Sequence, residues 1–375
     1  MKTNFLSCDI KSQTVEELQT QFQAWEAPTY RVEQLLNWLY EQHVTNWDQM
    51  TNLSKPLREK LAQQYSLQSH ELVVVQGSRD TTQKFLWKLS DGSFIESVLI
   101  PANPALYGEA SDRHTLCVST QVGCAYGCKF CASGLDGYKR NLGVHEIVEQ
   151  IIAVERWHAK QPDAKAGERL INNLVIMGMG EPLANYENLM KALNLLNAPY
   201  GGGIGARKIT ISTSGLAPQI RKLADEPAQY RLAVSLHGAT DEVRTKIMPV
   251  NKKFPLAELA NALDYYQSRK GRMITFEYIL IAGVNDGPDQ IKPLSDLARR
   301  LNAKVNLIPY NRVDGLEWDR PAEVVQESFL EALTKRDVIA TLRREKGHDI
   351  DAACGQLRLK TEKGIAQSKA SVVVE

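Results

Sequence analysis

Three cysteines that lie close together in the chain have the most specific chemistry. Cys124, Cys128 and Cys131 are separated by three and two residues. A structural zinc site closes all four ligand positions, so these three thiols cannot complete one alone. Three thiolates can instead hold a four-iron, four-sulfur cluster and leave one iron open to an outside ligand. The spacing therefore indicates iron–sulfur chemistry. The alternatives are a zinc site completed by a distant residue, and thiols that bind no metal.

Polar and glycine-rich motifs follow several apolar segments further along the chain. They are Gly178–Pro182 after NNLVIM, Ser212–Gly215 after KITI, Ser235–Gly238 after RLAV, and Asn311 after VNLIPY. If those segments are parallel barrel strands, the motifs share the carboxyl edge, where barrel active sites are built. Any one of them is explained equally well as a turn or helix cap, but together they predict a site.

Strand and helix patterns alternate from Leu116 onward. The predicted strands are 116–120, 172–178, 208–213, 231–236, 273–281 and 304–310, and the predicted helices are 144–158, 186–196, 217–225, 241–247, 256–267, 291–301 and 324–336. Such alternation is typical of a parallel sheet with helices outside. We predict an α/β fold with a partial (β/α)6 TIM-like barrel, and an open doubly wound sheet is the second choice.

The first hundred residues predict helices followed by short strands. Segments 15–25, 30–44 and 54–65 are helical in pattern, with Ser54 available as a cap and Pro56 in the first turn. Segments 72–77, 84–92 and 94–101 are rich in branched and aromatic residues and end in turn signals. We therefore divide the chain into a helical accessory domain (1–75), a β-rich extension (76–110), the barrel (111–345) and a carboxyl-terminal segment (346–375).

Composition and charge are those of an ordinary globular protein. The 375 residues carry a net charge of +1, so binding to nucleic acid has to rest on local patches. No apolar run is long enough to span a membrane, and the amino terminus lacks the apolar stretch of a signal peptide. Six cysteines, three of them in one loop, favour metal binding in a reducing compartment. We expect a cytoplasmic monomer with no membrane partner.

The C-x3-C-x2-C loop resembles that of the radical S-adenosylmethionine (SAM) superfamily. Over nearly the whole chain, the sequence resembles the RlmN and Cfr family of RNA methyltransferases, and the RlmN type is the closer match. The resemblance rests on FIESVLIP, LCVSTQVGCAYGCKFCASG, GYKRNL, GMGEPL, ITISTSG, VSLHGATDEVRTKIMPVN, LIPYN, ACGQL, YRVEQLLNWLY and MTNLSKPLRE. It implies a barrel of the radical SAM type and a small helical domain that takes part in RNA recognition.

The resemblance also implies the cofactors and the residues that hold them. Cys124, Cys128 and Cys131 would bind one 4Fe-4S cluster, whose open iron chelates SAM. The residues implied to contact SAM are Gly180, Glu181, Ser212, Ser235, Leu236, His237 and Asn311. Two molecules of SAM would be used per turnover, and a low-potential, flavodoxin-like donor would supply electrons.

Two outlying cysteines acquire a role through the chemistry that the family performs. Carbon 2 of adenine lies between two ring nitrogens and is too electron-poor to attack the methyl group of SAM. In the implied route Cys354 accepts a methyl group, a radical made from it adds to carbon 2, and Glu96 removes the proton. Cys117 then releases the product by forming a transient disulfide with Cys354. Taken alone, the residues allow plainer interpretations: a buried strand cysteine, a loop thiol and a solvated acid. Cys8 matches no motif.

The implied substrate is an adenine in the peptidyl-transferase region of 23S ribosomal RNA, together with an adenine of some transfer RNAs. The alternatives are carbon-8 methylation of the Cfr type, a radical SAM enzyme with a peptide or small-molecule substrate, and an iron–sulfur electron carrier. The basic residues predicted to contact RNA phosphates are Lys129, Lys139, Arg140, Arg207, Lys208, Arg244, Lys246 and the basic carboxyl-terminal segment. Residues 1–80 carry 7 Lys and Arg against 10 Asp and Glu, so shape should matter more than charge in the accessory domain.

Overall fold

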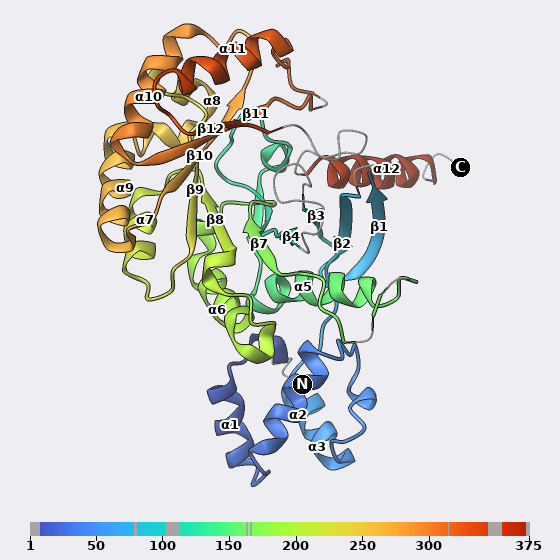
Figure 1. Ribbon diagram of the computed structural model, residues 1–375. Helices are drawn as coiled ribbons and strands as arrows, with labels where there is room; N and C mark the ends of the chain where they lie inside the picture. The colour runs from blue at the N-terminus through green and yellow to red at the C-terminus, as the bar shows by residue number, and fades with distance from the viewer. Residues whose placement is uncertain are drawn as a thin grey trace.

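The computed structural model describes residues 8–78, 81–102, 113–162, 164–165, 167–313, 315–343 and 355–372, with side chains as far as residue 365. Cys354 lies outside the described residues. Figure 1 shows three parts: helices α1 to α3 at one end, a long curved sheet in the middle, and helices α6 to α11 along the outer side of that sheet. The carboxyl-terminal helix α12 lies beside strands β1 to β3.

The helices and strands have the following bounds. The helices are α1 (Val15–Ala24), α2 (Tyr30–Tyr40), α3 (Lys55–Gln64), α5 (Val144–His158), α6 (Tyr186–Asn197), α7 (Ala217–Asp225), α8 (Asp241–Ile247), α9 (Leu256–Lys270), α10 (Ile291–Arg300), α11 (Glu323–Thr334) and α12 (Gln356–Val372). The strands are β1 (Glu71–Gly77), β2 (Gln83–Lys88), β3 (Phe94–Pro101), β4 (His114–Cys117), β5 (Gln121–Gly123), β6 (Tyr138–Asn141), β7 (Asn173–Ile176), β8 (Ile209–Thr213), β9 (Arg231–Ser235), β10 (Ile274–Leu280), β11 (Ala303–Pro309) and β12 (Ala340–Leu342).

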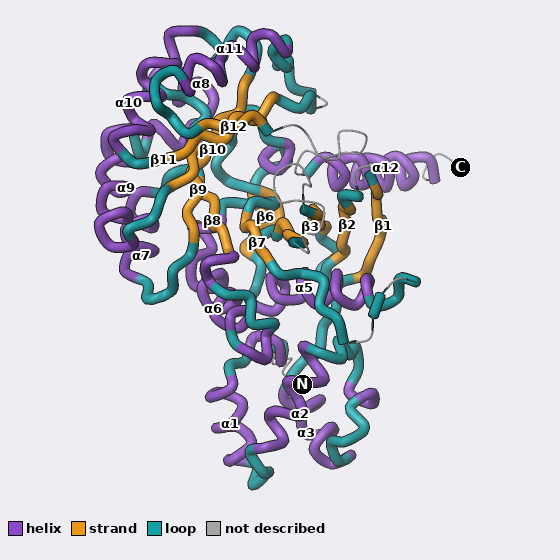
Figure 2. Tube along the Cα trace, in the orientation of Figure 1, coloured by secondary structure: helices purple, strands orange, loops and turns teal. Residues whose placement is uncertain are grey.

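One sheet of ten strands runs through the molecule in the order β1-β2-β3-β4-β7-β8-β9-β10-β11-β12. The strands from β4 to β12 pair in parallel, and β1, β2 and β3 extend the sheet by antiparallel pairing. The sheet ends at β1 on one side and at β12 on the other, so the barrel is open. The predicted partial barrel is therefore confirmed, and Figure 2 shows its strands inside a layer of helices.

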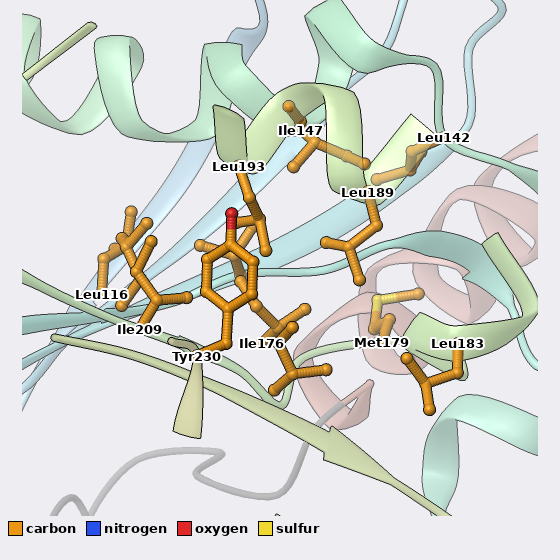
Figure 3. Packing of buried hydrophobic residues seen from close by; sticks show 14 of the residues in the cluster. Leu116, Leu142, Ile147, Ile176, Met179, Leu183, Leu189, Leu193, Ile209 and Tyr230 are labelled. Carbon is orange, nitrogen blue, oxygen red and sulfur yellow. The ribbon is translucent and has the colours of Figure 1, made fainter. Parts of the chain in front are cut away.

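The core forms where apolar strand residues meet the apolar faces of helices. Figure 3 shows side chains of β4, β7 and β8 packing against those of α5 and α6. Ile176, Leu189 and Leu193 are completely buried there. Burying one such side chain stabilises the fold by about 1.5–3 kcal/mol, so this layer holds the carboxyl ends of the strands in fixed positions.

The accessory helices are fixed to the barrel through buried charges. Thr14 caps α1: its hydroxyl oxygen accepts from the amide of Glu17, and the Glu17 carboxylate accepts from the amide of Thr14. Ser54 occupies the predicted cap of α3, but its side chain makes no capping hydrogen bond. Lys11 and Arg156 both bond the buried carboxylate of Glu149 on α5, at 3.0 and 3.1 Å. The Lys11–Glu149 pair therefore docks the small domain on α5, and Arg156, which itself belongs to α5, donates to the carbonyl of His43 at 2.8 Å.

Most predicted elements appear in the structure within a few residues of their predicted bounds. Strand β12, the hairpin of β5 and β6, and helix α12 were not predicted. The domain boundaries remain predictions; strand β1, which begins at Glu71, crosses the one at residue 75. Among the described residues, no helix combines the length and apolar character that a transmembrane segment requires.

Candidate active site

A cavity of about 340 Å³ opens at the carboxyl edge of the parallel strands. The predicted site residues that line it are Cys124, Cys128, Cys131, Gly180, Glu181, Ser212, Ser235, His237 and Asn311. Leu236 is fully buried and is not among the lining residues, so its side chain does not face the cavity. The motifs therefore converge from five separate segments of chain, as parallel topology requires.

The cysteine loop is held by close backbone contacts. Gly123 has a φ of +76°, and a Cβ there would lie 1.9 Å from the carbonyl oxygen of Gly137. The amide of Cys124 donates to that same carbonyl at 3.1 Å, and the amide of Cys131 donates to the carbonyl of Cys128 at 3.1 Å. Only glycine fits at position 123, because the two arms of the hairpin cross there.

The donor set fits an iron–sulfur cube better than a single ion. Within the described part of the chain, no three His, Cys, Asp or Glu side chains stand close enough together to hold one metal ion. A cube needs wider spacing, since each thiolate binds a different iron. Burial raises the pKa of Cys124 to about 11, and it also raises the pKa of Cys128 well above the usual value. The thiols are therefore protonated before the metal binds, and binding has to release those protons.

The GMGE loop is tied to its neighbours by the Glu181 side chain. Its carboxylate accepts hydrogen bonds from the amides of Leu183, at 3.1 Å, and Ser214, at 2.7 Å. Burial raises the pKa of Glu181, while the hydrogen bonds to Ser214 act against this. Gly180 has a φ of +99°, and a Cβ there would meet the Cβ of Gln121 at 2.5 Å. The carboxylate therefore joins two loops, which leaves backbone groups of this motif to face a ligand.

His237 is neutral and firmly oriented. Its Nδ1 accepts a hydrogen bond from the amide of Ile279 at 3.0 Å, and its ring meets the Phe130 ring edge-on at 4.7 Å between centroids. Burial, followed by the charge of Arg244, lowers the pKa of His237 to about 3. The backbone at His237 has a φ of +54°, which is unusual for a residue other than glycine. Such conformations occur often at functional sites.

Glu96 of strand β3 contacts the start of helix α12, although the two are far apart in the sequence. Its Oε2 accepts hydrogen bonds from the amide of Gly355 at 2.6 Å and pairs with the Lys84 ammonium at 3.0 Å. Its Oε1 accepts from the amide of Arg358 at 2.7 Å. The carboxylate thus caps the first turn of α12. Glu96 and Lys84 are both almost completely buried, so each neutralises the other.

Cys117 lies on the same face of the sheet as Glu96. Val98 of β3 pairs with Cys117 of β4, and Glu96 precedes Val98 by two residues. Side chains two apart in a strand share a face, and so do paired residues of neighbouring strands. Cys117 is buried and lies outside the lining of the cavity. Since Gly355 bonds Glu96, the chain next to Cys354 is held close to the strand pair that carries Cys117.

Several contacts of α12 were missed by the sequence analysis. Arg358 is completely buried and pairs with Asp136 at 3.0 Å and Glu362 at 2.7 Å. Asp136 belongs to the loop that follows the cysteines, so this pair joins α12 to the cluster loop. The signal that could have shown Lys84 was a lysine directly before the apolar run FLW of strand β2, because a charge buried there needs a partner.

The cavity also contains an acid that the motifs did not single out. Glu277 of β10 is buried and accepts a hydrogen bond from Asn306 at 2.7 Å. Burial raises the pKa of Glu277. Its strand pairs Glu277 with Ser235, so the two side chains lie side by side on one face of the sheet.

Four of the predicted phosphate contacts have other functions or positions. Arg140 forms ion pairs with Asp91 and Glu146, both at 2.7 Å. Arg244 is completely buried, which excludes a surface contact. Arg207 and Lys208 precede β8, so they lie at the amino edge of the sheet, opposite the cavity.

Two exposed lysines lie beside the cavity. Lys129 belongs to the cysteine loop and Lys246 to α8, and both are exposed. The amide of Lys129 donates to the carbonyl of Ile247 at 3.0 Å, which brings the two lysines to the same rim. Lys139 is half-exposed and lies 3.5 Å from Glu362. The rim of the cavity thus carries exposed positive charge at Lys129 and Lys246.

Comparisons with known proteins agree with the geometry. Residues 8–67 match the family described as the ribosomal RNA large subunit methyltransferase N-terminal domain, and residues 118–292 match the radical SAM superfamily. The chain is 54% identical to a probable dual-specificity RNA methyltransferase RlmN 3 from Opitutus terrae, over 94% of this chain and 95% of that protein. A probable dual-specificity RNA methyltransferase RlmN from Akkermansia muciniphila is 52% identical, over 94% and 96%.

A solved structure has the same fold over almost its whole length. The crystal structure of a radical SAM methyltransferase from Sphaerobacter thermophilus is 41% identical, with a TM-score of 0.85, over 93% of this chain and 98% of that one. The family implies a 4Fe-4S cluster and SAM as cofactors. On these similarities, the chain belongs to the RlmN family and is a SAM-dependent RNA methyltransferase of the radical SAM superfamily.

Proposed function

We propose that this protein methylates carbon 2 of an adenine in the peptidyl-transferase region of 23S ribosomal RNA, and of an adenine in some transfer RNAs. Cys354 carries the methyl group as a thioether before it reaches the base. The hydrogen bond between Glu96 and Gly355 is the observation that best supports this route. It holds the residue next to Cys354 beside the strand pair of Glu96 and Cys117, where the route requires it.

The residues of the chain have the following roles in the reaction. The Cys354 thiolate takes a methyl group from one SAM by displacement. When bound, the cluster and a second SAM supply a 5′-deoxyadenosyl radical, which removes a hydrogen atom from that methyl group. The resulting carbon radical on Cys354 bonds to carbon 2 of adenine, and the one electron that the adduct has to lose returns to the oxidised cluster.

Release of the product then needs a base and a second thiolate. Glu96 takes the proton from carbon 2. The Cys117 thiolate attacks the sulfur of Cys354, and the carbon–sulfur bond breaks with its electron pair on the former methylene carbon, which gains a proton. The two cysteines are left as a disulfide, which a two-electron donor reduces. Because Glu96 bonds Gly355, Arg358 and Lys84 in this structure, the first turn of α12 has to shift before the carboxylate can act as a base.

SAM and RNA approach from the same open edge. We propose that Gly180, Glu181, Ser212, Ser235, Leu236, His237 and Asn311 hold SAM, with Glu181 and Leu236 contributing through their backbones. Lys129 and Lys246 on the rim contact RNA phosphates. Cys124, Cys128 and Cys131 hold the cluster.

The product identifies the reaction. Reduced, cluster-loaded protein incubated with SAM and unmodified ribosomal RNA is expected to form 2-methyladenosine, detected by mass spectrometry of the digested RNA. Formation of 8-methyladenosine alone would instead identify the Cfr type of reaction. Cleavage of SAM without any methylated nucleoside would favour a substrate other than RNA.

A substitution at Gly355 is expected to disturb the position of Cys354. Gly355 has a φ of +84°, and a Cβ there would lie 2.9 Å from the amide nitrogen of Ser133. This backbone conformation costs an L-residue about 1–2 kcal/mol of conformational free energy, and the steric clash adds to that cost. Gly355→Ala is therefore expected to slow RNA methylation at least about tenfold, while formation of 5′-deoxyadenosine continues.

Gly364→Ala is the matched control, because Gly364 lies in α12, the helix that Gly355 directly precedes, and a Cβ there would contact nothing within 4 Å. It should leave both products at the level of the unaltered protein. Equal methylation rates in Gly355→Ala and Gly364→Ala would contradict the positioning of Cys354 through Gly355.

The buried imidazole of His237 predicts a sensitivity of folding to acid. Its folded pKa of about 3 lies below the usual 6.5, so its contribution to stability is complete above pH 6.5 and is lost as the pH falls toward 3. The loss is about 1.4 kcal/mol per pH unit in that window. His237→Gln removes the titrating group, so urea unfolding between pH 6.5 and 4 should depend less on pH than in the unaltered protein. Identical pH slopes would show that His237 is not held neutral.

A further inference from the structure

Helix α8 (Asp241–Ile247) carries one side chain that is completely buried although it is charged. The Arg244 guanidinium is 0% exposed. A buried arginine is retained only where its hydrogen bonds are made, because leaving them unmade costs several kcal/mol. Its partners therefore show what it does.

All three guanidinium nitrogens of Arg244 are occupied, and two of them bond backbone carbonyls in the site. Nη2 donates to the carbonyl of Ser214, which follows β8, and Nε donates to the carbonyl of Leu236, which follows β9, at 3.2 Å. Nη1 donates to the Oδ1 of Asn251 at 2.7 Å. The two carbonyls belong to the motif loops that carry Ser212 and Ser235, so one side chain fixes the distance between these loops.

The two loops contain glycines where they pass Arg244. Gly215 has a φ of +106°, and a Cβ there would lie 3.0 Å from Nη2 of Arg244. A Cβ on Gly238 would lie 2.6 Å from the amide nitrogen of Arg244. The glycines of STSG and SLHG are therefore explained by the close approach of the arginine and its helix.

The same short helix also contacts the cysteine loop. The carbonyl of Ile247, at the end of α8, accepts from the amide of Lys129, which lies between Cys128 and Cys131. Burial lowers the pKa of Arg244 to about 10 while the Asp241 carboxylate acts against this, so the guanidinium stays protonated at neutral pH. Helix α8 thus joins three segments: the loop after β8, the loop after β9 and the cysteine loop.

We propose that Arg244 is a positioning residue for SAM: it holds the loops of Ser212 and Ser235 at one fixed distance from each other and from the cysteine loop. The inference rests on the placement of SAM under the proposed function. It replaces the sequence-based expectation that Arg244 contacts RNA, and it assigns RNA contact on α8 to the exposed Lys246 instead.

Two substitutions on α8 distinguish these assignments. Arg244→Gln and Arg244→Lys are compared with Lys246→Gln in cluster-loaded protein, with SAM affinity measured by calorimetry and RNA affinity by filter binding over a series of salt concentrations. Arg244→Gln is expected to raise the dissociation constant for SAM at least about tenfold, since two carbonyls lose charged hydrogen bonds. Arg244→Lys should restore little of the SAM affinity, because an ammonium group cannot make the three hydrogen bonds of the planar guanidinium at once.

Both Arg244 variants should keep the RNA affinity and the iron content of the unaltered protein. Lys246→Gln should show the reverse, with unchanged SAM affinity and weaker RNA binding whose dependence on salt is reduced by about one phosphate contact.

Three results would overturn the assignment of Arg244. The first is a SAM affinity within about twofold of that of the unaltered protein in both Arg244 variants. The second is a larger loss of RNA affinity than of SAM affinity in these variants. The third is loss of iron and of folded structure in both of them. The last would make Arg244 a residue of general stability. Failure of the unaltered protein to methylate RNA would instead refute the proposed function, and the two failures are thus distinguishable.

Discussion

Replacement of Cys354 by Ala is expected to abolish methylation of RNA while the protein still cleaves SAM to 5′-deoxyadenosine under reducing conditions. The physical reason is that carbon 2 of adenine is too electron-poor to take a methyl group directly, so removal of the sulfur removes the only carrier. The cluster ligands and the proposed SAM contacts are untouched by this change. We expect methylation to fall by more than about a thousandfold, as removal of a covalent nucleophile typically does.

Cys8→Ala is the control for this experiment. Cys8 is an exposed thiol of the accessory domain, and Gln13 donates to it at 3.3 Å. Its loss should change neither product. RNA methylation by the Cys354→Ala protein at an appreciable rate would refute the carrier role, whereas loss of SAM cleavage in that protein would indicate damage to the cavity instead.

Replacement of Cys117 by Ala is expected to stop the reaction one step later. The methyl-derived carbon can still join Cys354 to adenine, but no thiolate is present to attack the Cys354 sulfur. A covalent complex of protein and RNA should therefore accumulate in near-stoichiometric amount, and free methylated RNA should fall to a small fraction of its usual yield. Denaturing gel electrophoresis with labelled RNA detects such a complex, and nuclease digestion should release a protein that carries one nucleotide.

The double variant Cys117→Ala, Cys354→Ala provides the control, because it cannot form the bond at all. A covalent complex in the double variant would show that another residue carries the carbon. Normal turnover by Cys117→Ala would remove this residue from the route. Since Cys117 is buried, thermal unfolding of each variant separates loss of packing from loss of chemistry.

The strands and outer helices could be predicted because their hydrophobic periods are strong and their ends carry ordinary turn residues. Segment 231–236 is an example: RLAVSL matches strand β9 within one residue. Helix α12 was missed since its pattern is weakly amphipathic and its first turn is held by Glu96, which is distant in sequence. The short edge strand β12 was missed because three residues carry little periodic signal.

In the site as well, features encoded by neighbouring residues were predicted, and features that depend on contacts between distant residues were not. The cysteine spacing and the motif positions after strands are local, and of the ten residues predicted to hold the cluster and SAM, all except Leu236 line the cavity. The charged residues were assigned less well, because a sequence does not show which charges are buried. Arg140 and Arg244 were expected to contact RNA, whereas Arg140 is paired with Asp91 and Glu146 and Arg244 is completely buried. Lys84 was overlooked although it pairs with Glu96.

The state of the Cys354 sulfur in protein purified from cells that supply SAM tests the account most directly. Mass spectrometry of the peptide that contains Cys354 is expected to find one methyl group on that sulfur, and the methyl should pass to RNA in a single turnover when the protein is reduced. An unmodified Cys354 thiol in protein that is nevertheless competent to methylate RNA would contradict the account.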